Sequence, residues 1–279
     1  NFSDESGAVK ALRDFQKPIL IQAYPDEIGH MSFAERRDAF CGKISICNYF
    51  NQCGIKYTIF SPHVVHPLDP RFIEQIQKFA KVCRVANGLS RLTIGALGAR
   101  ATAFKTVRYD EVTLEKNNIT VEAIDLSELF ARVDRIDNDN QEVLKTIGEL
   151  SEYTNFAKTP HERIVYMAKT LVAVLQYIRE YKMDAVGIRC WNEFPESKKI
   201  SVCLIASYLN HIGIPCTCEV DIYNALAMKA LSLLSDAPAT VMDWNNNYGD
   251  EKNKCILFHC GPMAKSMVEG PTEVQVHKM

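Results

Sequence analysis

Residues 159–189 read TPHERIVYMAKTLVAVLQYIREYKMDAVGIR, and this stretch carries the pattern that decides the fold. Thr159, with Pro160 next to it and Glu162 three residues later, predicts a capping box with proline at the first helical position. Apolar residues then recur at helical spacing, so we expect an amphipathic helix. The helix is followed by Ala185–Arg189, a short and largely apolar run that is typical of a strand covered on both faces.

The same alternation of short apolar runs and helical patterns extends along the chain. Strands are predicted at Pro18–Tyr24, Lys56–Phe60, Leu92–Leu97, Ile119–Ile124, Ala185–Arg189, Pro215–Cys218, Ala239–Met242 and Lys254–His259. Further helices are predicted at Ser32–Gln52, Pro70–Val82, Ser197–Ile212 and Asp221–Leu234. Repetition of strand, helix and strand is typical of a parallel sheet with helices on both faces. We therefore predict an α/β fold with doubly wound, mostly parallel sheets in two Rossmann-like units.

Composition and charge exclude several classes of protein. The chain has 279 residues, of which 47% are hydrophobic, and its formal net charge is -2. A near-neutral chain without a basic stripe is not expected to have nucleic acid or an anionic membrane as its main partner. The apolar fraction is that of a globular protein rather than a disordered one. No run of about 18 apolar residues is present, so we predict no membrane span.

Ten cysteines are scattered along the chain, mostly within apolar segments. Free cysteine is among the most buried residue types, so reduced core thiols in a cytoplasmic protein are favoured over disulfides. No Cys-x-x-Cys pair occurs. Its absence argues against a zinc knuckle or a thioredoxin-type redox centre.

Glu219, Asp243 and His259 each stand at the end of one of the last three predicted strands. Ligands of open α/β sheets bind beyond the carboxyl ends of the strands. Two carboxylates and one imidazole suit Mn²⁺, with Mg²⁺, Co²⁺ or Fe²⁺ as alternatives, and such a site favours Lewis-acid and proton-transfer chemistry on a sugar. Each residue alone also has a simpler interpretation, as a helix cap, a turn or a buried hydrogen-bonded ring.

The segment Arg189-Cys190-Trp191-Asn192-Glu193-Phe194 follows the predicted strand 185–189 and holds one of the two tryptophans. Tryptophan faces commonly stack on sugar rings, and arginine binds hydroxyl groups. Arg189 and Trp191 are therefore candidate substrate-binding residues. Packing at a domain junction explains the same residues equally well.

At these residues the chain resembles the L-fucose isomerase and L-arabinose isomerase superfamily. Three segments are similar to family segments and occur in family order: residues 121–132 (VEAIDLSELFAR), 183–187 (MDAVG) and 217–225 (TCEVDIYNA). Glu219, in the third segment, stands where the family has a metal-binding glutamate. Asp243 follows at a spacing within the family's range for its second metal carboxylate, and His259 is similar to the metal-binding histidine of the arabinose isomerases in a looser context.

The resemblance implies interconversion of an aldose and a ketose through a metal-bound cis-enediol. Glu219 and Asp243 would hold Mn²⁺ and move the proton, with His259 as a third ligand, while Arg189 and Trp191 would line the sugar pocket. A monosaccharide substrate and a homo-oligomer with shared active sites are also implied. Two alternatives are a non-catalytic sugar-binding relative of the same fold and a metal-binding module without turnover.

Family members are longer than this chain, so the resemblance implies a fragment. Residues 1–85 are expected to be the C-terminal part of a first α/β domain, residues 86–235 a second α/β domain, and residues 236–279 the start of a truncated C-terminal domain. A hinge-like composition at Val85–Ser90 and the absence of Met at position 1 agree with this expectation. A further metal-binding histidine of the family's C-terminal domain has no counterpart here.

Overall fold

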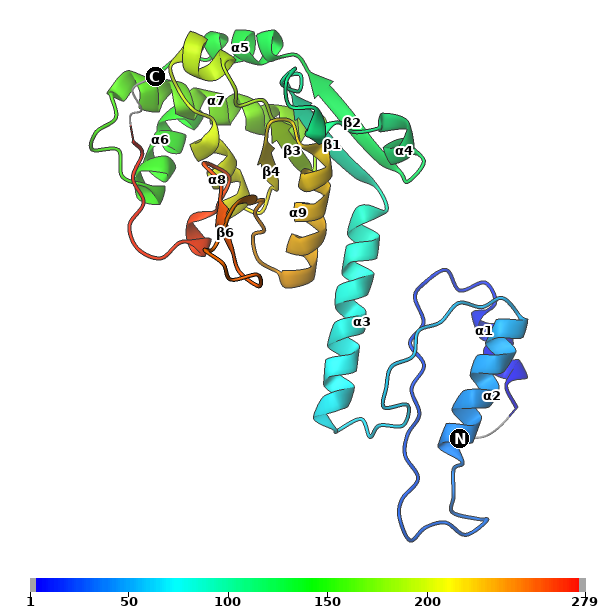
Figure 1. Ribbon diagram of the computed structural model, residues 1–279. Helices are drawn as coiled ribbons and strands as arrows, with labels where there is room; N and C mark the ends of the chain where they lie inside the picture. Colours follow the sequence, from blue (N-terminus) through cyan, green and yellow to red (C-terminus); the bar gives the residue numbers. More distant parts are fainter. Residues whose placement is uncertain (1–3, 276–279) are drawn as a thin grey trace. The chain divides into compact units, whose positions relative to one another are not determined.

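The computed structural model describes residues 4–275 and forms two compact units, which meet in the sequence between Arg84 and Val85 (Figure 1). The helix α3 (Pro70–Leu89) contains this boundary and is longer than the predicted Pro70–Val82. The stretch at Val85–Ser90, expected as a hinge between two units, is helical through Leu89 and begins at the boundary between the units. The described residues from 236 to 275 belong to the same compact unit as residue 85 onward.

The first unit has a small core of its own. Its helices are α1 (Ser6–Leu12), α2 (Ala39–Gln52) and the first part of α3. Val9, Phe50 and Ile55 are buried together at its centre. The helix α2 begins later than the predicted Ser32, because Asp38 adopts a left-handed conformation with φ 49° at the residue that precedes the first turn.

The strands predicted at 18–24 and 56–60 are reduced to single residue pairs. In the described part of the first unit, isolated parallel bridges join Leu20 to Thr58 and Ala23 to Val64. Pro18, Pro25 and Pro62 flank these bridges. Proline has no backbone N–H to donate, so a continuous ladder cannot extend past these positions.

The second unit is built on a four-stranded parallel sheet. Its strands are β1 (Leu92–Leu97), β2 (Ile119–Ile124), β3 (Ala185–Ile188) and β4 (Cys216–Cys218). They lie in the order β2-β1-β3-β4, and every neighbouring pair is parallel (Figure 1). The predicted α/β class with a parallel sheet is confirmed.

Helices cover both faces of this sheet. Along β1, Leu92, Ile94 and Ala96 contribute to one buried cluster, which includes residues of α9, and Leu97 contributes to the cluster on the other face. The helices of the second unit are α4 (Glu111–Glu115), α5 (Leu126–Arg135), α6 (Gln141–Tyr153), α7 (His161–Glu180), α8 (Cys203–His211) and α9 (Ile222–Ser235), with short turns at Lys105–Val107, Phe194–Lys198 and Lys265–Met267. Buried residues of α5 to α8 form the larger cluster.

The helix α7 is the longest in the second unit, but its start differs from the prediction. Pro160 is the capping residue and no side-chain cap forms. Thr159 therefore lies one residue outside the helix, and its buried hydroxyl oxygen has no hydrogen-bond partner. The predicted capping box is wrong for this reason. Among the described residues, no helix, α7 included, combines the length and the apolar character needed to cross a bilayer.

Residues 243–258 form an exposed antiparallel hairpin rather than strands of the parallel sheet. Its strands are β5 (Asp243–Asn247) and β6 (Cys255–Phe258), and all of their residues are exposed. The predicted strand at 239–242 does not form, and Asp243 begins a strand instead of following one. Hairpin pairing uses backbone groups only, so a polar asparagine run can form a strand that apolar patterning does not reveal.

The side chain of Asn210 connects the segment that follows the hairpin to the sheet. This buried side chain in α8 accepts a hydrogen bond from Cys216 N (2.7 Å) and donates to Cys216 O (3.0 Å) and Pro262 O (2.6 Å). Ser207, one turn earlier, donates to Met263 O at 2.6 Å. The chain after β6 is thereby held against α8 and the end of the sheet.

We expect Asn210→Leu to lower the free energy of unfolding by about 2–5 kcal/mol, because it leaves several buried backbone groups unpaired. Urea denaturation followed by circular dichroism would measure the change. Asn253→Leu, at an exposed position, is the matched control and should change stability by no more than about 0.5 kcal/mol. Equal effects of the two substitutions would contradict the role given to Asn210.

Candidate active site

Glu219 lies directly after β4, at the carboxyl end of the parallel sheet, as predicted. Both Glu219 and Val220 have left-handed backbone conformations, with φ 64° and 59°. Positive φ is uncommon outside glycine and is a genuine outlier for a β-branched residue such as valine. Strain of this kind persists only where the surrounding structure enforces it, and it concentrates at functional sites.

Packing and hydrogen bonds hold this turn in place. Val220 is 1% exposed and belongs to the core between the sheet and α9. The hydroxyl of Thr217 donates to Asp221 O at 2.9 Å, and Asp221 caps α9 by accepting from Asn224 N at 3.0 Å. Gly187 in β3 gives the turn its space, because a Cβ there would lie 3.1 Å from Val220 Cα.

The carboxylate of Glu219 is half-buried, and burial raises its pKa. Two nearby groups act in the opposite direction: the imidazole of His259 and the indole N–H of Trp191, which donates to Glu219 Oε1 at 3.2 Å. Asp243 adds a smaller repulsion that raises the pKa further. Four of the five predicted site residues, Glu219, Trp191, Asp243 and His259, are thus linked through the Glu219 carboxylate.

Trp191 and Arg189 are held by the loop that follows β1. The Trp191 ring stacks on Phe104 with centroids 5.6 Å apart and planes 11° from parallel. Arg189 donates to Ala99 O at 2.9 Å and pairs with Glu193. Phe104 was not among the predicted site residues, because nothing in its local sequence distinguishes it from an ordinary loop residue. One face of the Trp191 ring thus packs on the protein, as the packing interpretation expects. Trp191 nevertheless remains 41% exposed.

Asp243 and His259 come together at the open end of the hairpin. Asp243 pairs with Phe258, the residue before His259. The ring of His259 is half-buried, and its Nδ1 lies 2.9 Å from Val241 O. Asp243 is exposed. Asp243 therefore lies in the hairpin and His259 directly follows it, just before the segment that α8 holds.

Glu219, Asp243 and His259 are residue types that bind divalent metals, but their side chains are not arranged as a metal site. Two carboxylates and an imidazole are ligands that Mn²⁺ accepts. Glu219 is half-buried, and its carboxylate accepts a hydrogen bond from the neutral indole of Trp191. Within residues 4–275, however, no three side chains of His, Cys, Asp or Glu converge closely enough to hold a metal ion.

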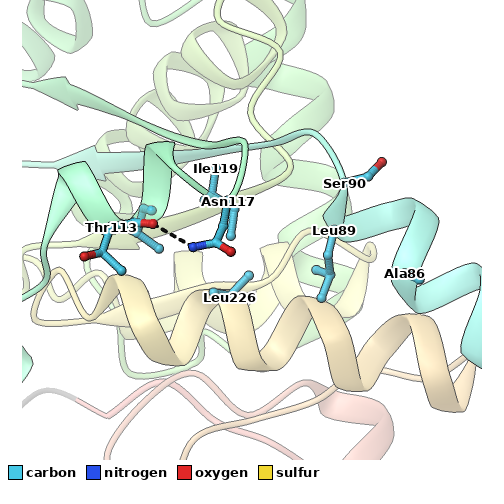
Figure 2. Close-up of a pocket in the computed structure, with 8 residues that line it drawn as sticks. Ala86, Leu89, Ser90, Thr113, Asn117, Ile119 and Leu226 are labelled. Carbon is cyan, nitrogen blue, oxygen red and sulfur yellow. Dashed lines mark hydrogen bonds between the residues drawn. The ribbon is translucent and has the colours of Figure 1, made fainter.

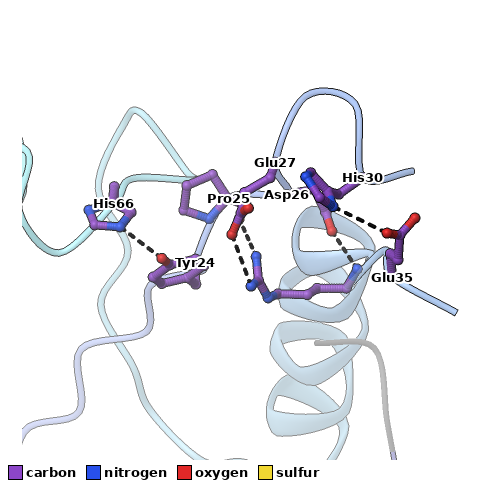
Figure 3. Close-up of polar contacts among 8 residues, drawn as sticks. Tyr24, Pro25, Asp26, Glu27, His30, Glu35 and His66 are labelled. Atoms are coloured by element: carbon purple, nitrogen blue, oxygen red, sulfur yellow. Dashed lines mark hydrogen bonds and ion pairs between the residues drawn. The ribbon is translucent and has the colours of Figure 1, made fainter. Parts of the chain in front are cut away.

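The first unit carries a separate polar cluster at the turn Tyr24–Glu27. Figure 3 shows the side chain of Tyr24 directed at His66, with its hydroxyl 2.8 Å from Nε2. Asp26 accepts from the backbone of Arg37 and Ala39, and these bonds hold the pKa of its carboxyl below the usual range. Asp26 thereby binds backbone N–H groups at the start of α2.

A hollow of about 350 Å³ lies at the other end of the sheet. Figure 2 shows its lining, which comes from the end of α3, from α4, from the start of β2 and from Leu226 of α9. Ser90 and Asn117 precede β1 and β2, so the hollow faces the amino ends of these strands. It is distinct from the Glu219 neighbourhood and contains none of the predicted site residues.

We expect Gly187→Ala to disturb the Glu219 turn, because the added methyl group meets Val220 backbone and the Thr217 hydroxyl at 3.1–3.2 Å. A loss of about 1–3 kcal/mol in the free energy of unfolding should follow. Trp191 fluorescence should change as well, since its N–H contacts Glu219. Gly148→Ala, where no atom lies within 4 Å of the added methyl group, is the control and should leave the fluorescence unchanged.

Comparison with known proteins gives two kinds of match. A family model described as "Fucose/sulfoquinovose isomerase, N-terminal domain" matches residues 1–90. The sulfoquinovose isomerases of Priestia aryabhattai and Priestia megaterium are each 24% identical over 275 residues, or 97% of this chain and 59% of theirs. That of Alkalicoccus urumqiensis is 25% identical over 72% of this chain and 45% of its own length.

The chain thus spans less than two thirds of the length of these curated relatives. Its first third matches the N-terminal domain of the family, and the longer alignments extend through the parallel sheet and the hairpin. The family match and the relatives together support the similarity of this chain to the fucose isomerase-like superfamily.

Proposed function

We propose that this protein is an aldose–ketose isomerase of the fucose isomerase-like type and that its substrate is the sulfonated sugar sulfoquinovose. The observation that carries the proposal is the strained, half-buried Glu219 at the carboxyl end of the sheet, with Trp191 bonded to its carboxylate. The names of the relatives supply the substrate.

Glu219 is proposed as the group that moves the proton between the two carbons. Isomerisation needs a base that removes a proton from the carbon beside a carbonyl and an acid that returns it to the neighbouring carbon. Burial raises the pKa of Glu219, which favours a carboxyl able to do both. The Trp191 N–H fixes one carboxylate oxygen and so orients the group.

The stacked rings of Trp191 and Phe104 are proposed as one wall of the sugar site. Trp191 keeps an exposed portion beside Glu219, where a sugar ring can pack against it. Arg189 is proposed to support this wall, since it ties the Trp191 segment to Ala99 in the loop that carries Phe104.

Glu219, Asp243 and His259 are proposed to hold a divalent cation, Mn²⁺ in the first place, with Mg²⁺, Co²⁺ or Fe²⁺ as alternatives. A metal bound there would polarise the carbonyl and hydroxyl oxygens and favour a cis-enediol. Holding it would require Asp243 and His259 to approach Glu219 more closely than they do here, and the exposed hairpin is the element that carries them.

We also propose a cytoplasmic location and a homo-oligomer with shared active sites. All ten cysteines are free thiols, which agrees with a reducing compartment. Only Cys216 and Cys218 are buried, so the expectation of mainly core thiols is wrong. The oligomer rests on the superfamily resemblance.

The full-length protein supplied with Mn²⁺ is expected to convert sulfoquinovose to its ketose, which nuclear magnetic resonance of the sugar can follow. Glu219→Gln should lower kcat/KM by at least about 100-fold, because the amide cannot exchange the proton. Glu115→Gln, at an exposed position in α4, is the matched control and should keep full activity.

Two outcomes would count against the proposal. Unchanged turnover in Glu219→Gln would remove Glu219 from the reaction. Sugar binding without turnover in the metal-replete protein would favour the non-catalytic sugar-binding alternative instead.

The full-length protein is also expected to retain Mn²⁺ after dialysis and to lose it in the double variant Glu219→Gln with Asp243→Asn. Inductively coupled plasma mass spectrometry gives the metal content per chain. The double variant Glu115→Gln with Asp139→Asn removes the same charges at exposed positions and should retain the metal. Metal content that survives the first double variant would show that the proposed site is wrong.

A further inference from the structure

The loop that follows β1 is basic, and we call residues 98–109 the basic loop. It contains Arg100, Lys105 and Arg108 and no aspartate or glutamate, although the whole chain has 34 acidic residues against 32 lysines and arginines. Within residues 4–275, no carboxylate forms an ion pair with any of these three cations. The basic loop therefore carries positive charge that no local ion pair balances.

Two contacts tie the basic loop to the surroundings of Glu219. Phe104 in the loop stacks on Trp191, whose N–H donates to Glu219 Oε1. Directly after the loop, the N–H of Asp110 donates to the hydroxyl of Tyr223 in the first turn of α9, the helix that follows the Glu219 turn. The positive charge of the loop thus lies beside the candidate active site.

The guanidinium of Arg100 lies next to the backbone of Phe104. Its Nη1 donates to Ala101 O at 2.6 Å and to Thr102 O at 3.3 Å. The backbone N–H of Phe104 donates to the same Ala101 carbonyl at 3.0 Å. One carbonyl oxygen therefore holds both groups and fixes the guanidinium at the Phe104 end of the aromatic pair.

These bonds leave one edge of the Arg100 guanidinium available. Arginine has five N–H donors in a planar fork, and those of Nε and Nη2 lie side by side, where they can bind two oxygens of one anion. Within the part of the chain that the structure describes, the hydrogen bonds of the Arg100 side chain use Nη1 alone. Because Arg100 is half-buried and already held, an anion would meet a preorganised edge.

Charge is distributed unevenly along the wall formed by Trp191 and Phe104. Glu219 lies at the Trp191 end, and Arg100 lies at the Phe104 end. Sulfoquinovose has a matching polarity, because its carbonyl carbon is at one end of the sugar and its charged sulfonate is on the terminal carbon at the other. A sugar whose reacting carbons lie near Glu219 keeps its sulfonate away from that carboxylate, which would repel it, and near the basic loop.

We propose that Arg100 binds the sulfonate of the substrate through Nε and Nη2, and that Lys105, the exposed residue after Phe104, adds a second positive charge. The basic loop then selects a sulfonated sugar over a neutral one. This inference rests on the proposed function, since it assigns further residues to the same site.

Steady-state kinetics of the full-length protein with Mn²⁺ and sulfoquinovose tests the role of Arg100. Arg100→Gln should raise KM about 10- to 100-fold, because a charge-assisted contact is lost. It should change kcat by less than about threefold, since the sulfonate is bound equally in the ground state and the transition state. Arg91→Gln removes the same charge at an exposed position before β1 and is the matched control, for which both constants should stay unchanged.

Quinovose, the same sugar without the sulfonate, separates sulfonate binding from a structural role. Isothermal titration calorimetry should show weaker binding of sulfoquinovose to Arg100→Gln than to the wild type, and equal binding of quinovose to both. Equal weakening of the two sugars, or a lower kcat with unchanged KM, would assign Arg100 to the structure of the loop and overturn the proposal.

Lys105→Gln provides a second test that does not depend on the bonds that Arg100 makes within the loop. It removes an exposed charge and should raise KM for sulfoquinovose about 2- to 5-fold, and an unchanged KM would count against the basic loop. If the wild type isomerises sulfoquinovose but Arg100→Gln behaves like Arg91→Gln, this inference is wrong and the proposed function stands. If the wild type neither isomerises nor binds sulfoquinovose, the proposed function is wrong and the inference fails with it.

Discussion

Both faces of the parallel sheet must be buried, and this constraint determines how closely the surrounding backbone can approach. β3 is buried along its whole length. Gly95 in β1 leaves room for Met183, whose sulfur would lie 2.4 Å from an added Cβ. Gly187 in β3 does the same for the turn after β4. The absence of a side chain at these two positions lets helices and turns reach the sheet without a gap.

The close approach at Gly187 connects the core to the chemistry. Val220 is buried in the core while its backbone has a positive φ, so burial of its side chain offsets strain in the turn. Glu219, its neighbour, is directed by the same turn to the carboxyl end of the sheet. The position of the carboxylate therefore depends on core packing as well as on its own hydrogen bond with Trp191.

The exposed hairpin has few means of attachment to the rest of the second unit. Asn210 and Ser207 hold the chain that follows β6. His259 and Asp243 are thus placed by an exposed element with one strong anchor. Both residues act on the pKa of Glu219, although no three side chains in the described part of the chain converge on a metal.

The sequence by itself determined the parallel sheet and the place of Glu219. The continuous apolar runs at Leu92–Leu97 and Ile119–Ile124 are typical of strands that are buried on both faces of a sheet. The structure has both strands with the predicted bounds. Hairpin pairing at Asp243 depends on backbone groups, and helix capping at Thr159 depends on which residue takes the first helical turn. Local patterns do not contain that information.

Only the tertiary structure decided which side chains meet. Phe104 reaches Trp191 from another loop, and Asn210 of α8 reaches Pro262 beyond the hairpin. Residues so far apart in the sequence leave no periodic signal of their contact. Their meeting follows from the order of the strands and from the packing of α8, which are properties of the folded chain as a whole.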